Sequence, residues 1–594
     1  MILKALYDYY HRSGNLAPAG KEIKEIPFLV VINKEGEFQR IEDRRIDKKR
    51  AQSFCVIKGS RTSAIVPYLF WDNVEYILNY TKDQETKNEG ENEESKKKRE
   101  TSAKKSQQKN DAAQKKFKEI SEKYPNDEEF RAVNLFYQKE ELSKTREDPL
   151  WEDIKKKPTV NISFLLEGRT TIVAENKLLD KETSEDTKDT EKDIKETVCL
   201  ISGKYGKIAE TTTATMIPGS QATAKLVSFQ VKSGYDSYGK EKGGNAPISV
   251  EAESAYTTAL NKLLGKDSRN KFNIGSRTFV FWASAQCEKA QEAENMMFDF
   301  MSYSNTEEDD PNKKIEQVRK FFNSIYSGSL NTSTEDRFYI LGLAPNAARI
   351  AVVYWEEIQL KDFASKICQH FEDMKIVDTR KNGKPYFGIH SILSAVTLKG
   401  KTSEVQPNLP EATIKSMLQG TPYPYSLFRA CISRIRAEQG SDHSASVTTG
   451  RAGIIKGYLN RLKDNNKKIT EMLDKKNSNQ GYLCGRLFAT LEYLQERSSN
   501  IHTIRERYMN AASATPAAIF PTLINLSVHH AEKLEKGGQI FFENIKGEII
   551  AKIDAAGFPS HLNLDDQGRF MVGYYHQRQE FYTSKETKEQ NEEI

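Results

Sequence analysis

Basic side chains gather close to an aromatic segment near the N-terminus. Six cations precede this segment, at Arg44, Arg45, Lys48, Lys49, Arg50 and Arg61, and the segment, 66–73, ends in Trp71, Asp72 and Asn73. Cations bind phosphates without regard to sequence, whereas amide and carboxylate groups can hydrogen-bond base edges. The combination predicts a site that holds nucleic acid by its backbone and inspects one or two bases. A solvated basic surface is the alternative that the sequence leaves open.

A second basic group lies in the glycine-rich segment 198–247. It comprises Lys204 and Lys207 and, further along the chain, the polar residues Ser237, Tyr238, Lys240 and Asn245. Glycines allow a backbone to approach a ligand closely, and lysines and amides donate to phosphates or bases. The segment predicts irregular loops on a small sheet that hold nucleic acid. A turn that serves only the fold is the alternative.

No pattern typical of an enzyme stands out in the sequence. The nearest approach to a phosphate-binding loop, 203–207, has neither the P-loop nor the dinucleotide-binding spacing, and the nine histidines show no metal-ligand spacing. His576 is the most plausible acid or base, but no nucleophile or carboxylate accompanies it, which favours packing within a helix. We therefore expect a protein that is not an enzyme, with no catalytic residue, no metal and no cofactor.

Hydrophobic periodicity predicts an α+β fold, with an irregular β-rich N-terminal and central region followed by a C-terminal α-helical bundle. We expect three regions: an N-terminal α+β region (1–150), a central mixed α/β region with polar Gly-rich loops (151–424) and a C-terminal helical domain (425–594). Within the first, 82–118 carries twelve Lys and Arg against eight Asp and Glu, and Phe117 is its one large hydrophobe. So little apolar surface predicts a peripheral Lys/Glu-rich insertion.

Whole-chain composition narrows the class of protein. The 89 Lys and Arg exceed the 84 Asp and Glu by only five, so a nucleic-acid partner must be inferred from local groups. The six cysteines stand singly, which is typical of reduced thiols, and no segment approaches the ~18 apolar residues of a membrane helix. These features predict a cytoplasmic protein with no membrane contact.

A series of segments, in order, resembles the large subunit of the type I-C CRISPR Cascade complex. The segments are 1–10, 26–28, 66–73, 237–240, 338–349, 426–428, 512–516 and 573–578. The resemblance spans nearly the whole chain and departs most in 82–118 and 211–224. It implies a non-catalytic subunit of an RNA-guided surveillance complex in antiviral defence, placed near the 5′ end of the CRISPR RNA.

The resemblance also implies partners and roles. The subunit would recognise the motif adjacent to a double-stranded DNA target, support strand separation and R-loop formation, and help recruit a helicase-nuclease. Other Cascade backbone and RNA-processing subunits would be further partners. The residues at 71–73 and 237–245 would then lie where target DNA meets the complex.

The resemblance further implies that the C-terminal region is also made as a separate small subunit from an internal start. Met472 is our candidate start, because the product 472–594 would have 123 residues and open just before a helix with leucines on one face. Fourteen Lys and Arg against sixteen Asp and Glu give this product a charge of −2. Nucleic-acid contact would therefore depend on a local face, for which the candidates are Arg486, Arg497, Arg505 and Arg507. A single C-terminal domain with an ordinary internal methionine is the alternative.

Two other functions stay open on the sequence. One is a metal-dependent nuclease whose ligands are dispersed along the chain. The other is a purely structural scaffold subunit whose basic loops face other subunits.

Overall fold

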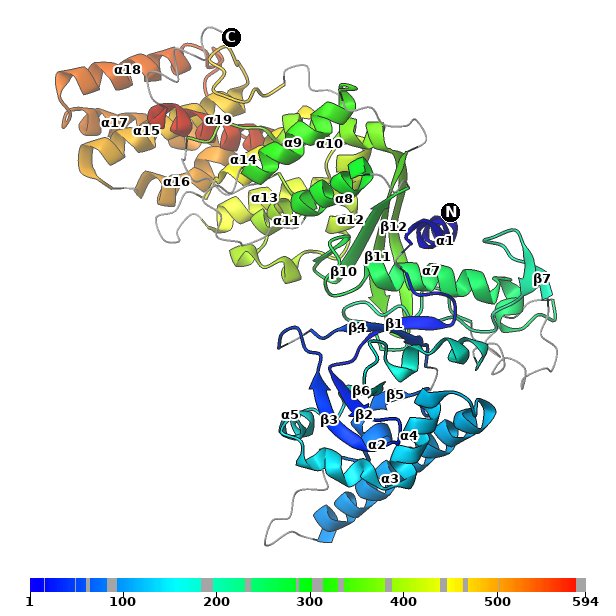
Figure 1. Ribbon diagram of the computed structural model, residues 1–594. Coiled ribbons are helices and arrows are strands. Elements are labelled where there is room, and N and C mark those ends of the chain that lie inside the picture. The colour runs from blue at the N-terminus through cyan, green and yellow to red at the C-terminus, as the bar shows by residue number, and fades with distance from the viewer. Residues whose placement is uncertain are drawn as a thin grey trace. The chain divides into compact units, whose positions relative to one another are not determined.

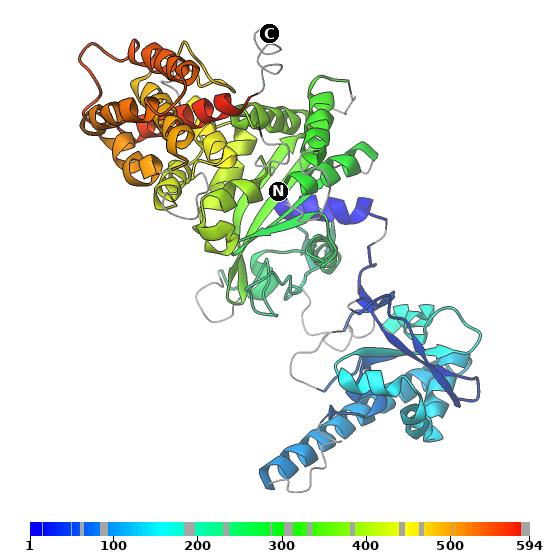
Figure 2. The same cartoon turned by 90° about the vertical axis from the view of Figure 1, so that its left-hand side faces the viewer.

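The computed structural model describes most of the chain, in two compact units (Figures 1 and 2). The described residues are 1–14, 16–48, 50–59, 65–82, 93–182, 196–229, 236, 238–284, 288–301, 313–329, 336–379, 387–438, 446–462, 468–501 and 503–583. Unit 1 consists of Met1–Arg12, Ala214–Ser228 and Leu260–Ile594, and unit 2 of Ser13–Thr213 and Phe229–Ala259.

Unit 2 is built on a four-stranded sheet in the order β3-β2-β6-β5. The strands are β2 (Phe28–Ile32), β3 (Phe38–Asp43), β5 (Trp71–Asn73) and β6 (Asn161–Leu166). Strand β2 is apolar and buried at every position, as expected of a central strand whose two faces are both covered. It pairs antiparallel with β3, through the turn at 33–36, and parallel with β6. Because β6 follows residue 150, the sheet crosses the predicted boundary; the three-region division of the chain stays a prediction.

Smaller elements surround this sheet. Strands β1 (Lys21–Glu25) and β4 (Ser53–Ile57) form a separate antiparallel pair. The helices of unit 2 are α2 (Val74–Leu78), α3 (Glu93–Lys123), α4 (Glu128–Gln138), α5 (Trp151–Lys156) and the first part of α7 (Val250–Leu263). Helix α4 begins after Asp127, whose carboxylate accepts hydrogen bonds from two free amides of the first turn.

The prediction that 82–118 is a peripheral insertion is wrong for the part of helix α3 that begins at Ser106. Residues 83–92 lie outside the described part, but from Ser106 onward the helix packs into the core of unit 2. Its buried positions recur every three or four residues, at Ser106, Asn110, Ala113, Phe117 and Ile120. The Phe117 ring stacks on that of Phe70 with centroids 4.6 Å apart. The expectation failed because small and polar residues complete this buried face; it holds for 97–105, where no residue is buried.

The glycine-rich segment forms irregular loops on a small sheet, as predicted. Strands β7 (Glu196–Val198) and β8 (Tyr205–Lys207) make an antiparallel hairpin. The loop before α7 lies against this hairpin, with the amide of Leu200 donating to the carbonyl of Pro247 at 2.9 Å. A Cβ at Gly243 would lie 1.9 Å from the carbonyl oxygen of Ala209, so this close approach requires glycine.

Unit 1 contains an antiparallel sheet in the order β12-β11-β10-β9. Its strands are β9 (Lys271–Ile274), β10 (Arg277–Ala283), β11 (Arg337–Asn346) and β12 (Arg349–Gln359), and nearby helices are α1 (Ile2–Arg12), α8 (Glu288–Met301), α9 (Lys313–Tyr326) and α10 (Leu360–Met374). The Phe338 ring of β11 stacks on Phe363 of α10 at 4.5 Å. Tyr9 of α1 contacts the ring of Trp282 in β10 at 6.4 Å. Helices thus supply the apolar surface that buries this sheet.

The C-terminal region is helical, which confirms the predicted bundle and the α+β fold class. Its helices are α11 (Ile389–Ala395), α12 (Leu409–Gln419), α13 (Tyr425–Ala437), α14 (Thr449–Asn460), α15 (Gln480–Ser499), α16 (Thr503–Ala514), α17 (Pro516–Ala531), α18 (Lys536–Ile550) and α19 (Leu564–Tyr582). Helices α15 and α19 nearly touch, since a Cβ at Gly485 would lie 2.0 Å from the carbonyl oxygen of Phe570. One continuous hydrophobic core runs from β9 to α19.

Membrane helices and disulfides are the two features of the described residues that bear on where the protein was predicted to act. Among its helices, none is long and apolar enough to cross a membrane. The cysteines within it, Cys55, Cys199, Cys368, Cys431 and Cys484, are free thiols.

Candidate nucleic-acid interface

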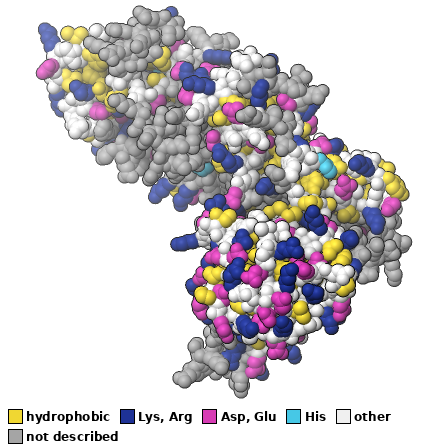
Figure 3. All heavy atoms as spheres, in the orientation of Figure 1, with side chains coloured by type: hydrophobic (Ala, Val, Ile, Leu, Met, Phe, Trp, Pro, Cys, Tyr) yellow, Lys and Arg dark blue, Asp and Glu magenta, His cyan; other side chains and the backbone are white. Residues whose placement is uncertain are grey.

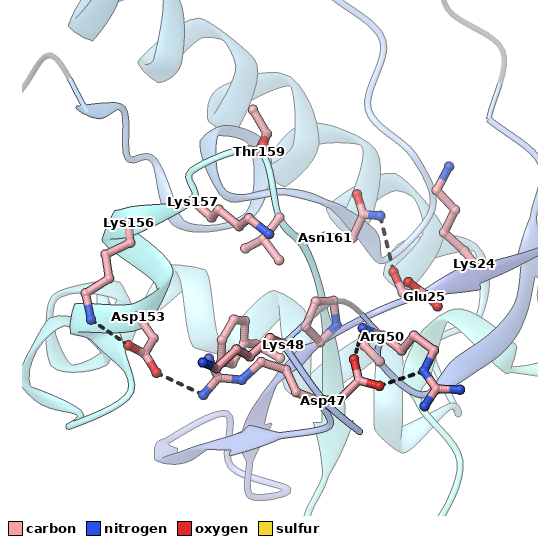
Figure 4. A pocket seen from close by; sticks show the side chains of 15 residues that line it. Lys24, Glu25, Asp47, Lys48, Arg50, Asp153, Lys156, Lys157, Thr159 and Asn161 are labelled. Atoms are coloured by element: carbon pink, nitrogen blue, oxygen red, sulfur yellow. Dashed lines mark hydrogen bonds and ion pairs between the residues drawn. The ribbon is translucent and has the colours of Figure 1, made fainter. Parts of the chain in front are cut away.

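A basic hollow of about 760 Å³ lies in unit 2 (Figure 4). It forms where strand β1, the turn after β3 and the connection from α5 to β6 meet. Six cations line it: Lys24, Arg45, Lys48, Arg50, Lys156 and Lys157. Three carboxylates line it as well, those of Glu25, Asp47 and Asp153. The balance of six against three gives the lining a charge of +3, which attracts anions.

Pairing between distant strands creates the hollow. The parallel register places Ile162 of β6 opposite Phe28 of β2, and so brings the α5–β6 connection beside β1. Asn161 fastens this junction by donating from its side-chain amide to the carbonyl of Glu25 at 3.3 Å. On the opposite side, the amide of Ile46 donates to the carbonyl of Arg50 at 2.9 Å, which closes a tight turn with Lys48 within it.

The two arginines of the hollow are held by carboxylates. Arg45 donates to Asp43 and, at 2.9 Å, to Asp153, and its guanidinium lies 4.9 Å from the centre of the Phe28 ring. Its hydrogen bond lowers the pKa of Asp43. Arg50 donates to Asp47 at 2.7 Å. These contacts fix the guanidinium groups in place and neutralise part of their charge.

Lys48 and Lys157 are the exposed cations of the hollow that keep their full charge. Neither side chain forms an ion pair or a hydrogen bond with any residue that the structure describes. In Figure 4 they lie on opposite sides of the hollow, Lys48 on the turn after β3 and Lys157 on the connection after α5. An anion bound between Lys48 and Lys157 would gain charge-assisted hydrogen bonds from both, and no existing ion pair of these two lysines would have to break.

The first predicted basic group is therefore only partly assembled here. Arg45, Lys48 and Arg50 line the hollow, Arg44 pairs with Glu42 at 2.8 Å, and Lys49 and Arg61 lie outside the described residues. Sequence reasoning missed the remaining polar lining, which is Lys24, Lys156, Lys157, Thr159 and Asn161. The lysine run 155–157 immediately before β6 was the available signal.

The aromatic segment beside this group is largely internal, contrary to the surface role expected of it. Trp71 and Asp72 are each 1% exposed, because β5 pairs with β6 and is covered by core residues. The Asp72 carboxylate accepts from the backbone amides of Tyr68 and Asn73. The Trp71 ring supports Lys24 of the hollow, whose Nζ lies 5.4 Å from its centre. The two side chains thus serve the fold and the hollow, and offer almost no free surface to a base.

Asn73 is the half-buried member of the segment. Its side-chain oxygen accepts from the amide of Glu75 at 3.1 Å and so caps α2. Its side-chain nitrogen makes no hydrogen bond with the described residues. The base-reading role expected of Asn73 stays a prediction, restricted to this amide nitrogen.

The second predicted group is brought together on the β7–β8 hairpin and the loop that packs against it. Lys204, Lys207 and Lys240 are exposed, and Tyr238 is fully exposed with a left-handed φ of 52°. Ser237 lies outside the described residues. Asn245 serves the loop itself, since its side chain donates to Asp236 at 3.0 Å and to the carbonyl of Lys240. The hairpin and this loop together offer two exposed aromatic rings, Tyr205 and Tyr238, and three exposed lysines, a combination suited to single-stranded nucleic acid.

Two of the four C-terminal arginines are buried, which corrects the expected basic face. Arg486 is 1% exposed and donates to Gln577 at 3.0 Å and to Glu548. Arg505 is 4% exposed and lies 3.8 Å from the fully buried Glu492. Only Arg497 and Arg507 are exposed. The sequence did not show that the other two are paired with carboxylates, those of Glu548 and Glu492.

His576 packs within the helical bundle, in agreement with the interpretation that the sequence favoured. It is fully buried, its Nδ1 lies 2.9 Å from the hydroxyl of Tyr482, and burial lowers its pKa to about 3. The described residues contain no group of His, Cys, Asp and Glu side chains able to hold a metal ion. Met472 lies in an exposed connection eight residues before α15.

Comparison with known proteins shows the family of this chain. The model of a protein family described as CRISPR-associated protein (Cas_Csd1) matches residues 6–582, which is nearly the whole chain. No curated protein matches the chain.

Proposed function

Because this chain belongs to the CRISPR-associated Cas_Csd1 family and so has a role in CRISPR defence, we propose that it is the non-catalytic large subunit of a type I-C Cascade surveillance complex. In this role it binds the double-stranded DNA target beside the CRISPR RNA, recognises the motif next to the target and supports strand separation. The observation that carries the proposal is the family match together with the collinear motifs of the sequence.

The basic hollow supports a backbone-binding role within this function. In RNA-guided recognition the guide reads the target by base pairing, while the protein holds backbones and inspects only a short adjacent motif. Such a protein needs positive surface and few base contacts. Lys48 and Lys157 supply unpaired charge, and Asn73 and Tyr238 are the side chains left to inspect a base or stack on one.

The proposed partners follow from the same role. They are the CRISPR RNA, the DNA target, the Cascade backbone and RNA-processing subunits, a small subunit made from the C-terminal region, and the helicase-nuclease that degrades the target. We place this assembly in the cytoplasm, where foreign DNA and the guide meet.

A scaffold role is the second candidate, and one observation favours it. Arg44, Arg45 and Arg50 are already paired with carboxylates in unit 2. On the face of unit 2 seen in Figure 3, acidic side chains likewise lie among the basic ones. A surface of this kind can face another subunit as well as a phosphate backbone.

Reconstitution of the complex with and without this chain separates these functions. Targets with an intact or a scrambled flanking motif are compared by equilibrium binding. The proposal expects tight, motif-dependent binding only with the chain present. Motif-dependent binding in its absence would leave the scaffold role, and chelator-sensitive cleavage by the chain alone would establish a nuclease instead.

A further inference from the structure

Two rows of lysines run along helix α3, and all six side chains except that of Lys116 are exposed. One row contains Lys97, Lys104 and Lys115, and the other contains Lys98, Lys105 and Lys116. Within each row the first two lysines are seven residues apart, which is about two helical turns and about 10 Å. The six residues, called the lysine stripe below, therefore form a band about 27 Å long on one side of the helix.

The buried positions of α3 fix which way this stripe faces. Ser106, Asn110 and Phe117 lie on the side of the helix that packs against α2 and α4. At about 100° per residue, the row of Lys97, Lys104 and Lys115 lies opposite that side, and the row of Lys98, Lys105 and Lys116 lies about a quarter turn from it. Figure 2 shows the N-terminal part of α3 extending beyond the sheet and the other helices of unit 2. The stripe is thus directed to solvent on a helix that is anchored at its other end.

The lysines of the N-terminal half of the stripe have no partner among the residues whose side chains the structure describes. Residues 97–105 contain five Lys and Arg against Glu100, a net charge of +4. Lys97, Lys98, Lys104 and Lys105 form no ion pair and no side-chain hydrogen bond with residues that the structure describes. Lys109, which lies nearly in line with the second row, pairs with Glu75 of α2. The row of Lys97, Lys104 and Lys115 is therefore the one that points away from the domain.

We propose that the lysine stripe binds the backbone of double-stranded DNA, as a contact separate from the basic hollow. A stripe about 27 Å long spans about eight base pairs at 3.4 Å per step, so its lysines can meet phosphates along one side of a duplex. The one aromatic residue of α3, Phe117, is buried, and the stripe therefore has no ring on which an unpaired base could stack. This feature favours a duplex over single-stranded nucleic acid.

The contact reads no sequence, because lysines to phosphates carry none. It would add affinity to any duplex that extends beyond the target. The inference rests on the proposed function, because that function makes DNA the anion that the stripe meets. An acidic protein surface is the alternative partner, and the test must distinguish it from DNA.

The test removes four charges without removing the helix. The variant K97Q/K98Q/K104Q/K105Q keeps residues of similar helix propensity, and its helicity is checked by circular dichroism. The charge-retaining variant K97R/K98R/K104R/K105R is the first control. The second is K266Q/K320Q/K361Q/K415Q, which removes four exposed lysines scattered over unit 1. Binding of the complete chain to a labelled 25-base-pair duplex and to the matching single strand is measured over a range of salt concentrations.

We expect the glutamine variant to weaken duplex binding at least tenfold near 0.1 M salt and to reduce the salt slope by about 0.9 for each phosphate that the stripe no longer neutralises. The arginine variant and the scattered control should retain the slope of the parent chain. Equal weakening in the scattered control would overturn the proposal, since net charge alone would then explain the effect.

Two other outcomes also overturn it. Unchanged duplex binding combined with failed assembly of the Cascade complex would assign the stripe to an acidic protein partner. An unchanged salt slope in the stripe variant, with motif-dependent target binding intact in the complex, would leave the proposed function standing and remove the stripe from it.

Discussion

The basic hollow of unit 2 and the arginines of helices α15 and α16 use the same kinds of side chain in opposite ways. In the hollow, Lys48 and Lys157 are exposed and have no carboxylate partner within the described residues. In the bundle, Arg486 and Arg505 are enclosed and meet the carboxylates of Glu548 and Glu492. A basic residue near aromatic residues thus binds an external anion only where the fold leaves its charge unpaired. Elsewhere its charge stabilises the fold itself.

The largest effect on stability should come from removing one of the buried arginines. Replacing Arg505 by alanine leaves the carboxylate of Glu492, which is fully buried, without its nearby cation. Removing one partner of a buried ion pair lowers the free energy of unfolding by about 3 kcal/mol. Chemical denaturation of the complete chain measures this decrease. The exposed neighbour gives the matched control, as Arg507→Ala should change stability by less than about 0.5 kcal/mol. Equal effects of the two would show that Arg505 is not buried as described.

Acid should destabilise unit 1 through two buried histidines. Burial lowers the pKa of both His370 and His576 to about 3, whereas in an unfolded chain their pKa is near 6.5. Both rings are therefore neutral in the folded protein, and the unfolded chain takes up protons first as the pH falls. The stabilisation is complete above about pH 6.5 and is lost toward pH 3, by about 2 kcal/mol for each histidine at pH 5.

Denaturation curves between pH 7 and pH 5 test this expectation. His576→Gln should make the pH dependence shallower, while His561→Gln, at an exposed position, should leave it as it is. A pH dependence of stability that His576→Gln leaves unchanged would contradict the lowered pKa of His576.

A substitution of Asn73 can distinguish its predicted contact with a base from its role as the cap of helix α2. Asn73→Asp keeps the oxygen that accepts from the amide of Glu75 and removes the side-chain nitrogen as a donor. If that nitrogen contacts a base, discrimination at one position of the flanking motif should fall by about 1 kcal/mol or more. Binding of the reconstituted complex to a set of targets that differ at single motif positions measures the change. Weakening that is uniform across the set would contradict a base contact.

The smallest effect on the chain itself is expected at Met472. Its side chain lies in an exposed connection, so Met472→Leu should leave the stability of the full chain unchanged within about 0.5 kcal/mol. If translation starts there, the variant should lose the 123-residue C-terminal product. Intact-mass analysis of the complex expressed from its native gene shows whether that product is present. A fragment that persists in the variant would exclude this start.

The structure adds a constraint on such a fragment. Helix α19 packs not only on α15 but also on earlier elements, since the hydroxyl of Tyr575 donates to the carbonyl of Val377 at 2.7 Å and to Thr449 at 2.9 Å. A product that begins at Met472 would leave this side of α19 without those partners. The separate subunit, if made, must therefore cover that surface in another way.

Much of the fold could be predicted because its signals are local. Helices α13 to α19 lie within the helical domain predicted at 425–594, because their apolar positions recur with the period of a helix. Strand β2 was evident as an uninterrupted apolar run. The buried half of α3 was missed because its internal face contains Ser106 and Asn110, where an apolar pattern would have been recognised.

The candidate site was harder to predict because it depends on long-range pairing. Asn161 and Glu25 are 136 residues apart, and the hollow exists only because β6 inserts beside β2. No local pattern states that pairing. Nor does a sequence show which basic residues acquire carboxylate partners, so Arg45 and Lys48 looked equivalent before the structure distinguished them.

The salt dependence of DNA binding tests the unpaired charge of the hollow most directly. The variant K48Q/K157Q and the control K266Q/K361Q each remove two exposed cations from the complete chain, and only the first pair lines the hollow. With a labelled duplex, the account predicts that the salt slope falls by about two units in the hollow variant, close to 0.9 for each phosphate that is no longer neutralised, and stays at the parent value in the control. An unchanged slope in the hollow variant, or an equal fall in both, would contradict it.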